Sequence, residues 1–118
     1  MIDEEINRLH FENIVWVIFA ILAFLNIVGD NDSINFLKTN NPKYKNESDT
    51  IFKITLFCTF LIYLYFFNRN IKAYKKVSQN KKELYKVKVY GSLFLIIGIL
   101  LLIYFQNKET SFLDSPAI

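Results

Sequence analysis

The sequence predicts an all-α, polytopic integral membrane protein with three transmembrane helices. Hydrophobic residues make up 53% of the 118-residue chain and aromatic residues 17%, both high for a water-soluble domain of this size. The apolar residues are also clustered, in three runs at residues 13–29, 51–68 and 89–105. A helix needs about 17 to 20 such residues to cross the roughly 30 Å hydrocarbon core of a bilayer. Each run is therefore long enough to span a membrane.

The third run argues against a water-soluble helical bundle, which is the main alternative fold. Every helix of such a bundle needs a polar stripe that faces water. Residues 93–105 read LFLIIGILLLIYF, in which only Gly98 and the Tyr104 hydroxyl interrupt the aliphatic and aromatic side chains. We therefore expect residues 1–118 to form a single membrane domain.

Basic residues are concentrated between the second and third runs, and they predict the orientation. Residues 68–88 hold eight of the 14 Lys and Arg residues, and Glu83 is the only acid among them. Together with Arg8 they place nine basic residues on one side of the membrane, against five on the other. Cytoplasmic flanks carry the excess of Lys and Arg. We therefore expect the N-terminus and the 69–88 loop in the cytoplasm, and the 30–50 loop and the C-terminus outside the cell.

The basic segment also predicts how the second and third helices are joined. Arg69, Lys72 and Lys76 share one helical face, which indicates that the second helix continues past the bilayer. We expect helices over residues 51–77 and 81–105 that extend into a basic cytoplasmic hairpin with a tight turn between them.

Two shorter patterns predict helix starts near the loops. Asn80, three residues before Glu83, resembles a capping box, although Asn holds the cap position instead of Ser or Thr. In the polar 30–50 loop, Ser33 is a candidate cap for a short helix.

The basic side chains of the hairpin are expected to meet anionic lipid headgroups or an acidic partner protein. Each Lys or Arg near an anionic leaflet gains about 1 kcal/mol, an amount that salt reduces. Nucleic-acid binding would need these charges interleaved with stacking aromatics, and Tyr74 and Tyr85 serve equally well as membrane-interface anchors, so we expect no nucleic acid. The residues of this basic group are Arg69, Lys72, Lys75, Lys76, Lys81 and Lys82.

The sequence offers no catalytic, cofactor-binding or metal-binding constellation. The middles of the three apolar runs lack Asp, Glu, His, Lys and Arg, the residues that mark chemistry or ion coupling inside a membrane. His10 is the only histidine and Cys58 the only cysteine, so a metal site would lack converging ligands and a disulfide would lack its second thiol. We expect a protein that is not an enzyme and holds no cofactor.

Small residues mark where helices are expected to pack. In lipid, helices associate at small residues that let two backbones approach closely. Gly91 and Gly98 are seven residues apart and share one face of the third run, with Leu95 between them. Ala20 and Ala23 give the first run a smaller notch. We interpret these five residues as helix-packing positions, either within the chain or against another subunit.

Polar residues inside the runs give two further predictions. Thr55, Thr59 and Tyr63 form the polar side of the second run and would line a path if several copies assembled. Asn26 lies near the outer end of the first run, where water is its default partner. If Asn26 instead faces the bundle, Thr55 lies at the matching depth of the second run.

These features favour a small non-catalytic integral membrane protein with an interaction role. Examples are an accessory subunit of a membrane complex and a self-protection protein of the immunity type, with another membrane protein or a second copy as its partner. The alternative is a homo-oligomeric channel or small carrier lined by the second helix. The Ile, Asn, Lys, Phe and Tyr content is typical of AT-rich genomes, such as those of many low-GC bacteria.

Overall fold

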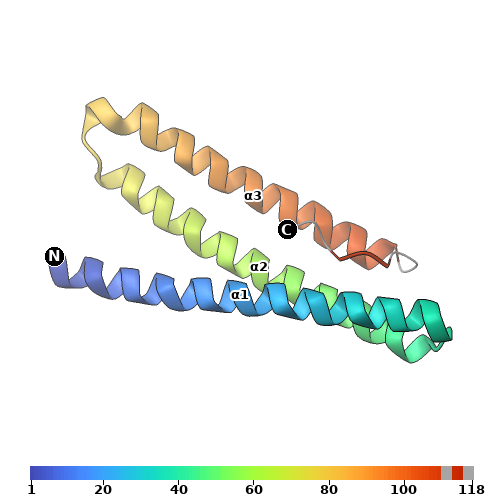
Figure 1. Ribbon diagram of the computed structural model, residues 1–118. Helices are drawn as coiled ribbons and strands as arrows, with labels where there is room; N and C mark the ends of the chain where they lie inside the picture. Colours follow the sequence, from blue (N-terminus) through green and yellow to red (C-terminus); the bar gives the residue numbers. More distant parts are fainter. Residues whose placement is uncertain (110–112, 116–118) are drawn as a thin grey trace. The chain divides into compact units, whose positions relative to one another are not determined.

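The computed structural model describes residues 1–109 and 113–115, and its regular elements are all helices. Figure 1 shows three long helices, α1 (Ile2–Thr39), α2 (Pro42–Lys76) and α3 (Lys82–Lys108), with a short 3₁₀-helix, η1 (Gln79–Lys81), before α3. By length and composition, α1, α2 and the combined η1–α3 segment could each cross a membrane. The expected all-helical chain with three such helices is confirmed, and it is consistent with a multi-pass membrane protein.

Helices α1 and α2 are longer than a membrane crossing requires. They contain 38 and 35 residues. At 1.5 Å per residue each extends for about 50 Å or more, against roughly 30 Å for the hydrocarbon core. The apolar runs 13–29 and 51–68 therefore occupy only part of each helix, and the polar residues around them are helical as well.

The segment predicted as a polar external loop at 30–50 is helical except for Asn40 and Asn41, and its side of the membrane stays a prediction. Asn40 adopts the left-handed conformation (φ 56°), and its N–H donates to the carbonyl four residues earlier at 2.7 Å, which ends α1. The side-chain oxygen of Asn41 then accepts the N–H of Lys43 at 3.1 Å. Pro42 occupies the first position of α2. An N–H at this position makes no hydrogen bond within the helix, so a proline, which lacks the N–H, fits there. The polar composition indicates a loop, whereas Asn40 and Asn41 form a two-residue turn before the helix that begins at Pro42.

Both predicted helix caps are wrong. Ser33 is buried inside α1, and its hydroxyl donates to the carbonyl of Leu113 at 2.8 Å. Asn80 lies within η1, where its side-chain oxygen accepts the Ser78 hydroxyl at 2.6 Å. Helix α3 begins at Lys82 without a side-chain cap, because the 3₁₀ turn carries the chain directly into it.

The chain divides into two compact units, and each contains a helical hairpin. The first unit comprises residues 1–55 and 113–118, of which 113–115 are the described part of the C-terminal segment. It pairs α1 with the start of α2. The second unit, residues 56–112, pairs the rest of α2 with α3. Its two helices are joined through residues 77–81, close to the turn expected from the sequence.

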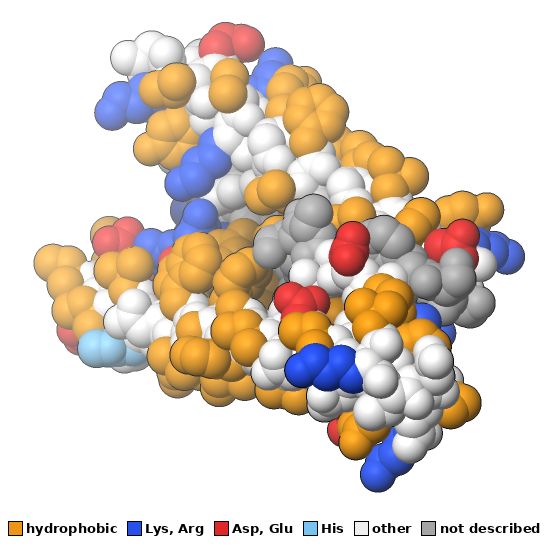
Figure 2. Space-filling model, turned by 45° about the vertical axis from the view of Figure 1, so that its right-hand side comes forward, with side chains coloured by type: hydrophobic (Ala, Val, Ile, Leu, Met, Phe, Trp, Pro, Cys, Tyr) orange, Lys and Arg blue, Asp and Glu red, His pale blue; other side chains and the backbone are white. Residues whose placement is uncertain are grey.

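The distribution of side chains is the reverse of that in a water-soluble domain. Among the described residues, nine polar or charged side chains are buried but only seven hydrophobic ones. Large apolar side chains are instead exposed, for example Phe24 (68% exposed) and Phe94 (70%), and hydrophobic side chains cover much of the face in Figure 2. Polar residues inside and apolar residues outside suit a lipid environment, where only the buried polar groups need partners from the chain.

Gly29 is the glycine at which the fold requires a small residue. A Cβ atom placed there would lie 2.9 Å from Cζ of the Phe52 ring, closer than real Cβ contacts come. The Phe52 side chain is only 1% exposed and has little room to move. Helices α1 and α2 therefore approach closely at this point, next to the end of the apolar run 13–29.

We expect Gly29→Ala to lower the free energy of unfolding by about 1–3 kcal/mol, because an added methyl group overpacks this contact. The measurement is the denaturation midpoint of the purified protein in detergent. Gly91→Ala is the matched control and should not lower the midpoint, since no described atom lies within 4 Å of its Cβ position. Equal midpoints for the two variants would contradict the close approach at Gly29.

Candidate functional site

Polar side chains join the two helices of the first unit. The Thr55 hydroxyl, which is 0% exposed, donates to Oδ1 of Asn26 at 2.9 Å and to the carbonyl of Phe52 at 3.0 Å. Because a hydroxyl carries one hydrogen, the two acceptors share it. Asn26 therefore faces α2. Of the two partners predicted for Asn26, water and Thr55, the structure contains Thr55.

A chain of hydrogen bonds crosses from α2 to α3 in the second unit. Arg69 donates through Nε (3.2 Å) and Nη2 (3.0 Å) to Oδ1 of Asn70. Nδ2 of Asn70 donates to Oγ of Ser92, and the Ser92 hydroxyl donates to the carbonyl of Lys88 at 3.0 Å. Asn70 and Ser92 are 6% and 8% exposed. Because these hydrogen bonds form only when Asn70 lies beside Ser92, they fix the register of α2 against α3.

The basic group near the turn divides into engaged and exposed residues. The guanidinium of Arg69 also lies 4.7 Å from the centroid of the Phe66 ring, within cation–π range. Nζ of Lys82 donates to the carbonyl of Tyr74 at 3.0 Å and lies 4.7 Å from the centroid of its ring. The exposed members are Lys72, Lys75, Lys76 and Lys81. Their contact with headgroups or an acidic partner stays a prediction.

The predicted helix-packing residues are not brought together in the described chain. No described atom lies within 4 Å of a Cβ placed at Gly91 or Gly98, and Leu95 is 53% exposed. Ala20 and Ala23 are exposed as well. Helix α2, which packs with α3 in the second unit, is therefore not the close neighbour of the two glycines. Packing against another subunit stays a prediction.

The predicted polar lining of α2 is mostly packed inside the chain. Thr55 and Thr59 are 0% and 1% exposed, and Tyr63 is half-buried. Thr55 already holds together α1 and α2 through its contact with Asn26. These residues act as packing residues here, and a lining role in an oligomer stays a prediction.

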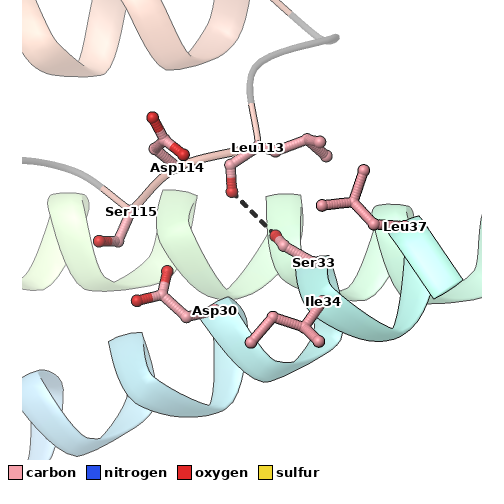
Figure 3. Close-up of a pocket in the computed structure, with 7 residues that line it drawn as sticks. All are labelled: Asp30, Ser33, Ile34, Leu37, Leu113, Asp114 and Ser115. Carbon is pink, nitrogen blue, oxygen red and sulfur yellow. Dashed lines mark hydrogen bonds between the residues drawn. The ribbon is translucent and has the colours of Figure 1, made fainter.

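A hollow of about 380 Å³ lies in the first unit between α1 and residues 113–115. Figure 3 shows Asp30 and Ser33 of α1 on one side and Asp114 on the other. The bond from Ser33 to the Leu113 carbonyl ties the two sides together. The hollow depends on the return of the C-terminal segment to α1, and no sequence pattern signals that return. The described residues contain no group of three or more His, Cys, Asp or Glu placed to hold a metal ion.

The helices and their contacts define the class of protein: a helical chain with three candidate membrane spans and inward-facing polar side chains. No protein-family model, no curated protein and no solved structure matches it.

A double-mutant cycle of Asn70→Ala and Ser92→Ala should show a coupling free energy of about 0.6 kcal/mol, the average size for hydrogen bonds between membrane helices. The measurement is the denaturation free energy in detergent of both single variants and the double variant. Asn70→Ala combined with Asn107→Ala is the control and should be additive, because Asn107 is exposed and bonds to the Ile103 carbonyl of its own helix. A coupling of zero for Asn70 and Ser92 would show that their contact does not hold α2 and α3 together.

Proposed function

We propose that the chain is a small, non-catalytic integral membrane protein that binds another membrane protein or a further copy of itself. The observation that carries this proposal is the exposed face of α3. Gly91 and Gly98 lie on that face with no described atom near their Cβ positions. The large side chains beside them, Phe94 and Leu101, are 70% and 65% exposed.

The spacing on this face matches that of a helix–helix seam. Its members recur every three or four residues, and glycines alternate with larger apolar side chains, so a second helix could place its own side chains over the glycines. A glycine inside a helix is less favourable than Ala by about 1 kcal/mol, and lipid contact alone gives no reason for it. The face comprises Leu84, Val87, Gly91, Phe94, Gly98, Leu101 and Phe105.

The same face is separate from the contact between α3 and α2. The buried residues of α3 are Ser92, Ile96, Ile99 and Gln106, all at most 8% exposed. They lie on another side of the helix from Gly91 and Gly98. A partner could therefore bind the glycine face without displacing α2. An accessory subunit of a membrane complex or a self-protection protein of the immunity type would use such a face.

The proposed orientation places the N-terminus and the 77–81 turn in the bacterial cytoplasm and the C-terminus outside. Its support is the nine-to-five difference in basic residues between the two sides. The exposed lysines near the turn would then meet anionic lipid headgroups, or an acidic protein, at the inner membrane surface. Neither this arrangement nor the apolar α3 face calls for nucleic acid, a cofactor or catalysis.

We expect Gly98→Leu to disrupt the assembly of the protein with its partner or with itself without lowering the denaturation midpoint of the monomer. The side chain would fill the space that a partner helix needs, and no described atom lies within 4 Å of its Cβ position. Sizing by analytical ultracentrifugation in detergent and cross-linking in membranes are the measurements. Ile97→Leu, a volume-conserving change at an exposed position off the glycine face, is the control.

Identical assembly in wild type and Gly98→Leu would rule out the α3 face as the contact surface. Ion flux through liposomes that contain the purified protein would instead support the alternative of a homo-oligomeric channel or carrier. The burial of Thr55 and Thr59 gives that alternative less support.

Single cysteines introduced at Asn80 and Asn46 in a Cys58→Ala background should react with an impermeant maleimide from opposite sides of the membrane. Position 46 should be labelled in intact cells and position 80 only after lysis, because the basic excess keeps the 77–81 turn inside. Replacing five lysines by Gln should produce a mixed orientation. They are Lys72, Lys75, Lys76, Lys81 and Lys82. Labelling of position 80 in intact cells would reverse the proposed orientation.

A further inference from the structure

Asp32 is a buried carboxylate with an incomplete set of hydrogen-bond partners. It lies in α1, three residues beyond the apolar run 13–29, and is 8% exposed. Its Oδ2 atom finds no hydrogen-bond donor among the described residues. Burial of Oδ2 favours the protonated form, since this oxygen has lost its water without gaining a donor from the described residues.

The charged groups that act on Asp32 from the facing helix are Glu47 and Lys43, both in the first turns of α2. Burial has the largest effect, and the negative charge of Glu47 acts in the same direction. The positive charge of Lys43 opposes them. Together these effects raise the pKa of the Asp32 carboxyl above its ordinary value. Asp30, two residues earlier, instead lines the hollow opposite Asp114 (Figure 3).

Asp32 lies between two fixed points of the α1–α2 hairpin. On one side, Gly29 is in tight contact with Phe52. On the other, the two-residue turn at Asn40 and Asn41 connects the helices. Ionisation of Asp32 would therefore leave a charged carboxylate whose Oδ2 has no donor among the described residues. This charge would lie in the packed end of the α1–α2 hairpin, where only two residues connect the helices.

We propose that Asp32 is a proton-controlled switch: the end of the α1–α2 hairpin is closed when the carboxyl is protonated and loosens when it releases its proton to water. The neighbouring residue Ser33 holds the C-terminal segment through the Leu113 carbonyl, so loosening also weakens that attachment. The inference does not depend on the proposed function.

The direction of the pH effect follows from proton linkage. The closed form binds the proton more tightly than the open form, in which the carboxyl is hydrated and has a pKa near 3.9. Protonation therefore stabilises the closed form fully below about pH 4, and the stabilisation is lost as the pH rises to the pKa of the closed form. Across that interval the closed-to-open ratio falls by up to about tenfold per pH unit, and above it the ratio is constant.

The test uses spin labels on cysteines introduced at Asn35 and Asn46, both exposed, in a Cys58→Ala background. The distance distribution between the labels should be narrow at about pH 4 and gain a longer-distance population by about pH 8. Asp32→Asn should abolish the change, because the amide has nearly the same shape and does not titrate. Asp30→Asn is the matched control and should respond to pH as the wild type does.

Two further variants test the electrostatics of the site at exposed positions. Glu47→Gln removes the like charge and should move the transition to lower pH, whereas Lys43→Gln should move it to higher pH. A wild-type distribution that is the same at about pH 4 and about pH 8 would overturn the proposal. So would a pH dependence that persists in Asp32→Asn, or shifts in the same direction for both α2 variants.

Discussion

The pairing of buried polar side chains is the constraint on which the rest of this structure depends. A polar group in apolar surroundings is unfavourable unless it is hydrogen-bonded, and lipid supplies no partner. Thr55 meets Asn26 in the first unit, and Asn70 meets Ser92 in the second. Each contact requires one register between two helices, because a shift by one residue would turn the polar side chains toward lipid. The apolar side chains outside can vary, but the polar ones inside must match.

The sequence predicts the helices better than their ends. Long apolar runs determine where helices must lie, so they predict all three long helices. The polarity of the 30–50 segment predicts a loop, but Asn41 and Pro42 start a new helix directly after a two-residue turn. Glycine spacing predicts helix packing at Gly91 and Gly98, whereas the tight contact is at Gly29. Only the fold shows which glycine meets a bulky ring across an interface.

Helix α2 contributes to both units, and this sets which surfaces remain for partners. In an apolar stretch of 18 residues in each helix, 28% of the residues are buried for α2, but only 17% for α1 and for η1–α3. The polar side of α2 is therefore largely used inside the chain. The outward faces of α1 and α3 remain, and α3 alone adds open glycine positions to its apolar surface. This difference favours a binding role for α3 over a pore lined by α2.

The two-residue connection at Asn40 and Asn41 also bears on how the protein is made. The entropic cost of closing so short a connection is small. Each packed pair also consists of helices that follow each other in the sequence. Such contacts can form as soon as the second helix of a pair leaves the ribosome. The α1–α2 hairpin would then enter the bilayer as one preassembled element, with Asn26 and Thr55 already shielding each other from the lipid.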